Sequence, residues 1–269
     1  MNKNLWIILL LVFGLSAAFA FACAQHGEPE YPNDASGPGG GGGRGDDDDN
    51  DDDNDDASPT GTAVAYVYGT GGLDDDDDSA TVAGFEALLA KAGIAATAFN
   101  EDEFVNATLS DFDAVIADAT TTWTNQTSVV AVRDAGIPVL GIMTGGGELF
   151  DYLDLNIGFS NGTWEYSDTQ IRVVDPSHAV FRTPHNLKAT QGELLTMSAT
   201  PFNIFYHDMS VPPPNTLDLA DRVVQTNYGV LTLEDGKYLF WGLDAPPTTF
   251  SAVAADLFVN CVTFLAGAK

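Results

Sequence analysis

One stretch, IPVLGIMTGGGEL at residues 137–149, constrains the fold of this chain more than any other feature. Its first part, Pro138–Ile142, is a continuous apolar run of the kind found in strands that are buried on both faces. The glycines Gly145–Gly147 follow directly, and we expect a helix to begin at Glu148 and to end near Leu155. A buried strand, a glycine-rich turn and a helix in this order predict an α/β fold.

The segments before this stretch alternate between apolar strands and amphipathic helices. We expect strands at Ala63–Tyr68, Ile94–Phe99 and Ala114–Ala117 and a helix at Gln126–Ala135. Another helix is expected between the first two strands, capped by Ser79 and ended by Gly93. Continuous apolar strands that alternate with helices predict a parallel sheet with helices on both faces.

After residue 155 the pattern changes to shorter strands. We expect these at residues 163–166, 170–174, 223–227, 230–233 and 238–243. Asp235 and Gly236 are the Asp-Gly pair of a tight hairpin between the last two, and a final helix is expected at Ala252–Leu265. The sheet should therefore gain antiparallel strands, and all of these elements belong to one expected domain, residues 61–269.

The first 22 residues have the features of a secretory signal, because Lys3 precedes the almost wholly apolar run Leu5–Phe21. Cleavage after Ala22 would leave Cys23 as the first residue, an arrangement that resembles a bacterial lipoprotein signal with an acylated cysteine. Such signals favour leucine where this chain has Ala20, so plain secretion and an uncleaved membrane anchor remain as alternatives. We expect a lipid-anchored protein of the bacterial cell envelope, at the outer surface or in the periplasm.

Residues 23–60 form an expected linker without apolar periodicity. Gly37–Gly45 is nearly all glycine, and Asp46–Asp56 is a run of aspartates with two asparagines. Such a segment cannot bury enough apolar surface to offset its ordering entropy, and like charges extend it, so we expect a disordered acidic spacer. The only other cysteine, Cys261, lies in an apolar run and is expected to be a buried hydrophobic residue.

The chain is strongly acidic throughout, with a formal net charge of −29. Residues 1–60 hold 12 acidic and 2 basic residues, and residues 61–269 hold 27 acidic and 8 basic residues. A surface of this sign repels phosphate backbones, so nucleic-acid partners are not expected. A protein or carbohydrate ligand, together with the membrane reached through Cys23, are the expected partners.

Two short motifs, with the order of the strands, resemble a known family. Gly141–Gly145 reads Gly-Ile-Met-Thr-Gly, and Val174–Phe181 is similar to an Asp-x-x-His-Pro element. On these residues the segment 62–267 resembles a class I glutamine amidotransferase-like domain, most closely its trehalose-utilisation (ThuA-like) branch. The resemblance implies a flavodoxin-like three-layer sandwich with a mostly parallel central sheet.

The reactive residues of that family's catalytic members are missing. The resemblance implies a nucleophilic cysteine after the fourth strand, where this chain has Met143, whose thioether has no ionisable proton. It also implies a histidine after the last strand, where this chain reads Gly-Leu-Asp-Ala-Pro-Pro from Gly242. Glutaminase chemistry is therefore not expected, as in many ThuA-like proteins.

Several residues near the carboxyl edge of the expected sheet are candidate ligand-binding residues, because ligands of open α/β folds bind there. They are Asp118, Met143, Thr144, Gly145, Gly146, Gly147, Glu148, His178 and Asp244. Backbone N–H groups of the three glycines would suit a ligand anion or polar oxygen, or the glycines only allow a sharp turn. Asp118, Glu148 and Asp244 would form a carboxylate cluster for sugar hydroxyls, a cation or acid/base catalysis, or they only cap helices. For His178 we expect a structural hydrogen bond.

A run of five aspartates follows the first strand. We expect Asp74, Asp75, Asp76, Asp77 and Asp78 to lie in a loop, which would respond to calcium or would be a solvated acidic tip. No other cofactor is expected. Three functions therefore remain open: a non-catalytic binding or scaffolding domain, which is our leading hypothesis, a carbohydrate-active enzyme that uses the acidic residues, and a calcium-dependent surface protein.

Overall fold

In the computed structural model, residues 61–69 and 75–268 are described, without the side chains of 75–79 and 165–167. These described residues all fall in one compact unit. The expected signal and linker, residues 1–60, lie outside the described residues, as does Asp74. None of the helices in the described ranges is long and apolar enough to cross a membrane.

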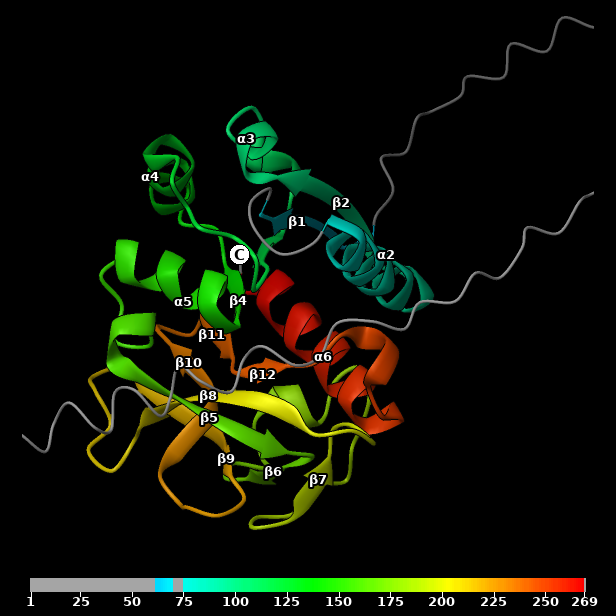
Figure 1. Ribbon diagram of the computed structural model, residues 1–269, viewed down its shortest axis with the longest axis vertical. Helices are drawn as coiled ribbons and strands as arrows, with labels where there is room; N and C mark the ends of the chain where they lie inside the picture. Colours follow the sequence, from blue (N-terminus) through cyan, green and yellow to red (C-terminus); the bar gives the residue numbers. More distant parts are fainter. Residues whose placement is uncertain (1–60, 70–74, 269) are drawn as a thin grey trace, which may run out of the picture. The chain divides into compact units, whose positions relative to one another are not determined.

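The described strands form one mixed sheet whose first half is parallel (Figure 1). The parallel strands, in spatial order, are β2 (Ala95–Asn100), β1 (Ala63–Tyr68), β3 (Ala114–Ala117), β4 (Val139–Ile142) and β11 (Tyr238–Trp241). β1, β3 and β4 are almost wholly buried, which explains their continuous apolar sequences. The α/β fold with a parallel start, predicted from the sequence, is confirmed.

Antiparallel strands extend the sheet beyond β11 in the order β10, β9, β6 and β7. These strands are β10 (Tyr228–Glu234), β9 (Thr216–Arg222), β6 (Gln170–Val173) and β7 (Leu194–Thr196). β8 (Phe202–Asp208) pairs with β10 and also with β5 (Gly162–Asp168) and β12 (Leu243–Asp244). The antiparallel second half is confirmed, but the expected strand at 223–227 is wrong, because β9 ends at Arg222 and these residues form the turn before β10.

Helices cover both faces of the parallel half of the sheet. The helices are α2 (Asp75–Lys91), α3 (Glu101–Phe104), α4 (Gln126–Ala135), α5 (Met143–Tyr152) and α6 (Ala252–Ala266). Short 3-10 turns are η1 (Leu109–Asp111), η2 (Phe159–Asn161), η3 (Ala179–Phe181) and η4 (Pro247–Thr249). α5 lies on one face, and α2 and α6 pack together on the other (Figure 1).

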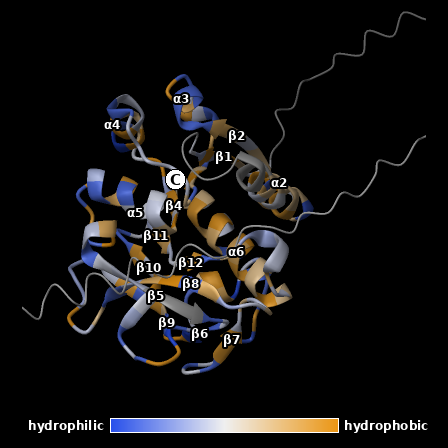
Figure 2. Ribbon diagram, in the orientation of Figure 1, coloured by the Kyte–Doolittle hydropathy of each residue, from blue (hydrophilic) through white to orange (hydrophobic). Residues whose placement is uncertain are grey.

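The core between these layers is aromatic and aliphatic. Phe85 of α2 packs 4.9 Å from Phe258 of α6, and Phe258 packs 5.3 Å from Trp241 of β11, measured between ring centroids. Hydrophobic residues line the central strands and much of α6 (Figure 2). Cys261 lies in this core at 0% exposure, as expected, and burial holds the pKa of its thiol far above the ordinary value.

Two helices begin earlier than the sequence predicts. α2 begins at Asp75, so Ser79 lies inside the helix and Asp75, Asp76, Asp77 and Asp78 do not form a loop. Aspartates in a first turn interact favourably with the helix dipole, which accounts for this start. α5 begins at Met143, so Glu148 lies in the middle of that helix and not at its N-terminus.

Candidate functional site

A cavity of about 430 Å³ opens at the carboxyl ends of β3 and β4. Its walls come from α2, the ends of β3, β4 and β12, and the segment from Ala245 into η4. The lining residues are Ala80, Thr81, Phe85, Asp118, Ala119, Thr120, Ile142, Leu243, Asp244, Ala245, Pro246 and Thr248. The cavity thus lies at the edge where open α/β sheets bind ligands, and its size is within the range of small-molecule sites.

Two of the predicted site residues, Asp118 and Asp244, both line this cavity. Asp118 follows β3 directly and is only 3% exposed. Its Oδ2 accepts a hydrogen bond of 3.0 Å from Thr120 Oγ1, and Thr120 Oγ1 in turn accepts 3.0 Å from the N–H of Gly69 after β1. The carboxylate of Asp118 is therefore held in place by the neighbouring strand end.

Asp244 enters the cavity from the antiparallel part of the sheet. It is exposed, and its Oδ2 accepts a hydrogen bond of 2.9 Å from the Asn203 side chain on β8. The cavity therefore combines one buried and one exposed carboxylate with three threonines and with apolar side chains of Phe85, Ile142 and Leu243. Such a surface can accept hydrogen bonds from ligand hydroxyl or amino groups and can contact an apolar ligand face.

Met143 lies at the sharp junction between β4 and α5. Its φ of 47° is in the left-handed region, which is uncommon for a residue with a side chain. A strained strand-to-helix turn of this kind is the nucleophile elbow of α/β enzymes. Met143 is 1% exposed and does not line the cavity, so its thioether is buried at this turn.

Two of the three glycines after Met143, Gly145 and Gly146, are required by close packing and not by the turn expected between strand and helix. A Cβ on Gly145 would lie 2.1 Å from the carbonyl oxygen of Asp118, and one on Gly146 would lie 2.2 Å from the carbonyl carbon of Gly141. The N–H of Gly145 donates to Ala119 O at 3.2 Å. Gly145, Gly146 and Gly147 are all buried within the first half of α5, and none of them lines the cavity.

Glu148 does not line the cavity with Asp118 and Asp244, because the early start of α5 places it elsewhere. Burial raises the pKa of Glu148, and the carboxylates of Glu101 and Asp151 raise it further. Asp151 has a structural role, because its carboxylate accepts a hydrogen bond of 2.9 Å from the N–H of Ser160. Thr144, one turn before Glu148, is half-buried and also lies outside the cavity lining.

Glu101 is a structural residue that the sequence reasoning missed. It is 6% exposed at the start of α3, and its carboxylate accepts the N–H groups of Thr122 and Trp123, the latter at 2.6 Å. Trp123 has a φ of 48°, and its Nε1 donates to Gly145 O at 2.8 Å. Glu101 thereby holds the segment after β3 against α5, and this segment contributes Ala119 and Thr120 to the cavity. Its position directly after a strand is the feature of the sequence from which a role for Glu101 could have been predicted.

His178 has the structural role expected from the sequence. Its Nδ1 accepts the N–H of Val180 at 3.4 Å and so caps the turn η3, and its ring packs against Phe264. Burial lowers the pKa of His178, whereas the carboxylate of Asp175 opposes this shift. His178 lies outside the cavity lining.

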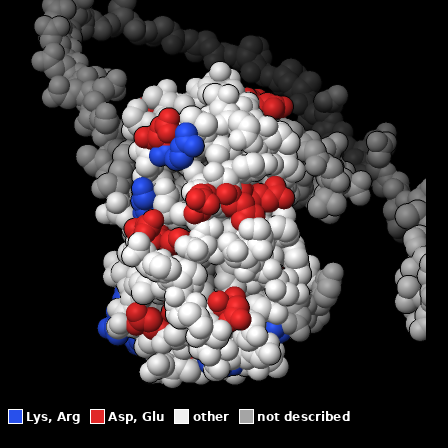
Figure 3. Space-filling view, turned by 90° about the vertical axis from the view of Figure 1, so that its left-hand side faces the viewer, with Lys and Arg blue, Asp and Glu red and all other residues white. Residues whose placement is uncertain are grey.

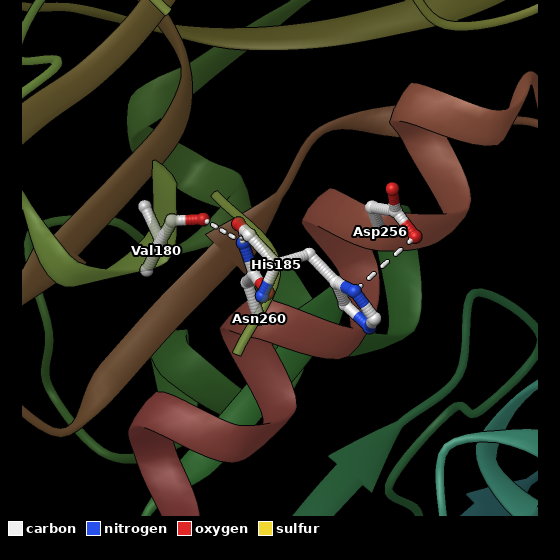
Figure 4. A network of polar contacts seen from close by, with 4 residues as sticks. All are labelled: Val180, His185, Asp256 and Asn260. Carbon is white, nitrogen blue, oxygen red and sulfur yellow. Dashed lines mark hydrogen bonds and ion pairs between the residues drawn. The ribbon is translucent and has the colours of Figure 1, made fainter. Parts of the chain in front are cut away.

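A polar network joins α6 to the loop that contains Val180 and His185 (Figure 4). The fully buried Asn260 of α6 accepts the N–H of His185 at 2.9 Å and donates to the carbonyls of His185 and Val180, both at 2.8 Å. The His185 ring lies 3.8 Å from the carboxylate of Asp256. These contacts give His185 a structural role in this loop.

Among the side chains that the structure describes, which exclude those of residues 74–79, no three His, Cys, Asp or Glu side chains are grouped so that they could hold a metal ion. The face that carries α4 and α5 shows several groups of acidic side chains and few basic ones (Figure 3). This distribution agrees with the acidic composition of the domain.

The mostly parallel first half of the sheet, the helices on both of its faces and the cavity at the carboxyl edge define a flavodoxin-like α/β domain. One solved structure supports this fold. A ThuA-like protein from Bacteroides uniformis superposes with a TM-score of 0.52 and 10% identity, covering 76% of this chain and 91% of that one. The glutaminase domain of Trypanosoma brucei CTPS with bound acivicin gives a TM-score of 0.47 and 12% identity over 77% and 94%. No protein-family model and no curated protein matches the chain.

Proposed function

We propose that this protein is an exported, lipid-anchored surface protein whose amidotransferase-like domain binds a small hydroxylated ligand without glutaminase chemistry. The observation that carries the proposal is the cavity that holds Asp118 and Asp244 together at the carboxyl edge of the sheet. The methionine at the elbow supports the non-catalytic part, because a thioether cannot attack a carbonyl carbon.

The composition of the cavity favours a carbohydrate as the ligand. The carboxylates of Asp118 and Asp244 can accept hydrogen bonds from sugar hydroxyls, and the apolar side chains of Phe85 and Leu243 suit the C–H face of a sugar ring. Described residues that line the cavity include no lysine and no arginine, so anionic ligands are disfavoured.

Titration calorimetry on the full chain tests this site with ligands from a glycan panel. Asp118→Asn and Asp244→Asn should each weaken binding about tenfold or more, because each removes a charged acceptor, worth about 1.5–3 kcal/mol. Asp235→Asn, in the hairpin turn between β10 and β11, is the matched control and should leave the affinity unchanged. Equal affinity in all three variants would place the ligand elsewhere.

A second candidate function, a carbohydrate-active hydrolase, is favoured by the same pair of carboxylates. Asp118 is buried and Asp244 is exposed, so the two carboxyl groups of the cavity lie in different environments. Different environments allow one carboxyl group to act as an acid and the other as a base. Turnover of a glycan should then fall at least 100-fold in Asp118→Asn while binding persists. Turnover that survives the Asp118→Asn and Asp244→Asn double substitution would exclude this site as the catalytic one.

The lipid anchor is tested separately from the ligand. The wild-type chain expressed in a bacterium should partition into the detergent phase, and Cys23→Ser should move it to the aqueous phase. Mass spectrometry of the mature N-terminus distinguishes the alternatives, since plain secretion leaves an unmodified end and an uncleaved anchor retains residues 1–22.

A further inference from the structure

An acid pair lies in the antiparallel half of the sheet, apart from the candidate cavity. Asp218 and Asp221 are three residues apart on β9, a spacing that places two residues of a regular strand on opposite faces. The pairing of β9 with β10 shifts register on both sides of Leu231, so that β9 gains a bulge between Asp218 and Ala220. Because of this extra residue in β9, the side chains of Asp218 and Asp221 lie on the same face of the sheet.

Gly229 of β10 provides the room in which the two carboxyl groups meet. Asp221 is the direct cross-strand partner of Gly229, and a Cβ built on Gly229 would lie 3.0 Å from Asp218 Oδ1. Asp221 is close enough to raise the pKa of Asp218 through its charge and through a side-chain hydrogen bond in which one of the two carboxyl groups is protonated. Two ionised carboxylates cannot form such a bond, because both are acceptors only.

Asp218 is half-buried, Asp221 is buried, and the pair has few other hydrogen-bond partners. Asp221 is 4% exposed, and its Oδ2 accepts the N–H of Asn227 at 3.0 Å. Among the described groups, none donates a hydrogen bond to Oδ1 of Asp218 or to Oδ1 of Asp221, although both atoms are buried. A buried acceptor without a donor is costly, and one proton between the two carboxyl groups supplies the missing donor.

The basic side chains on β9 and on the neighbouring strand β6 make contacts with other groups. Arg172 of β6 faces Asp221 across the sheet, but its guanidinium donates to the carbonyls of Arg222 and Val223. The Arg222 guanidinium lies 4.6 Å from the centre of the Tyr206 ring. On β10, the residues opposite the pair are uncharged: Gly229 faces Asp221, and the buried Thr232 faces Asp218. Asp208, at the end of β8, is an acidic residue that is exposed to solvent.

We propose that Asp218 and Asp221 share one proton at neutral pH and that the β9–β10 region loses stability as the pH rises toward the release of this proton. Burial raises the pKa of Asp218 to about 8, and the hydrogen bond and charge of Asp221 contribute to this increase. The folded protein therefore binds one proton more than the unfolded chain between the ordinary aspartate pKa and about pH 8. Stability decreases as the pH rises through this window and is constant above it.

Chemical denaturation of the full chain between pH 6.5 and 9 tests the proposal. For the wild type, the unfolding equilibrium constant should rise by up to about tenfold per pH unit until the pair is fully ionised near pH 8. Asp218→Asn should remove this rise, because an amide N–H donates to Asp221 at every pH. Asp208→Asn, an exposed neighbour, is the control and should retain the wild-type profile.

Infrared spectroscopy of the wild type gives a second readout that needs no stable variant. The carbonyl band of a protonated carboxylic acid should be present at pH 6.5, should disappear by pH 9.5, and should be missing from Asp221→Asn or Asp218→Asn. Absence of the band at pH 6.5 overturns the proposal, because both carboxyl groups would then be ionised. An alkaline loss of stability that is equal in wild type and Asp218→Asn overturns it too.

Discussion

Replacing Glu101 tests how the segment after β3 is held. In Glu101→Ala the buried N–H of Trp123 and the partly buried N–H of Thr122 lose their acceptor. A buried donor without a partner costs about 1–3 kcal/mol, so two donors, one of them partly solvated, should cost roughly 3 kcal/mol in the free energy of unfolding. For a domain of this size that loss lowers the melting temperature by roughly 6–12 °C.

Two further variants make the measurement specific. Glu101→Gln keeps one acceptor oxygen but loses the charge, so its loss should be smaller, about 1–2 kcal/mol. Glu103→Ala changes an exposed glutamate of the same short helix and should cost less than 1 kcal/mol. Urea denaturation gives all three values, and a loss in Glu101→Ala no larger than that in Glu103→Ala would refute the role of Glu101.

Three other predictions concern the packing and the pH response of the fold. Gly145→Ala should destabilise the domain by at least about 2 kcal/mol in urea denaturation, because the new Cβ would clash with the Asp118 carbonyl. Asn260→Ala should cost about 2–4 kcal/mol, since His185 and Val180 lose three hydrogen bonds, whereas Asp256→Ala should cost less than 1 kcal/mol. His207 is buried, and burial lowers its pKa to about 4, so the unfolded chain binds more protons below the ordinary histidine value. As the pH falls from 6.5 to 4, the free energy of unfolding of the wild type should therefore decrease by roughly 3 kcal/mol more than that of His207→Gln. Identical pH profiles of the two proteins would contradict this prediction.

The parallel half of the fold could be predicted from the sequence because its strands are buried on both faces. The expected bounds of β1, β3 and α4 agree with the structure. The Asp-Gly turn at Asp235 is also confirmed, with φ of 53° at Asp235 and 72° at Gly236. In these elements local propensity and tertiary burial favour the same conformation.

The start of α5 and the position of β9 could not be predicted, for two different reasons. Three consecutive glycines disfavour a helix by local propensity, but the close approach of Gly145 and Gly146 to their neighbours makes glycine necessary there. β9 carries a half-buried aspartate, Asp218, and a buried one, Asp221, on either side of a bulge, so its sequence lacks the polar-out pattern of an ordinary strand.

The candidate site was partly predictable. Asp118 and Asp244 directly follow or end strands, and strand ends meet at one edge of a sheet, so the cavity brings them together as expected. A carboxylate cluster that includes Glu148 requires a helix that begins at Glu148, but α5 begins five residues earlier. The roles of Met143, Thr144, Gly145, Gly146, Gly147 and His178 as ligand contacts stay predictions.

The most direct test of ligand binding at the Asp118–Asp244 cavity is the melting temperature of the full chain against mono- and oligosaccharides, calcium and small carboxylates. A sugar at about 100 times its dissociation constant should stabilise the fold by about 2.7 kcal/mol, a shift of several degrees. The proposed function predicts this shift in the wild type and its loss in the Asp118→Asn and Asp244→Asn double variant. A shift with calcium alone, or a sugar shift that the double variant keeps, would contradict it.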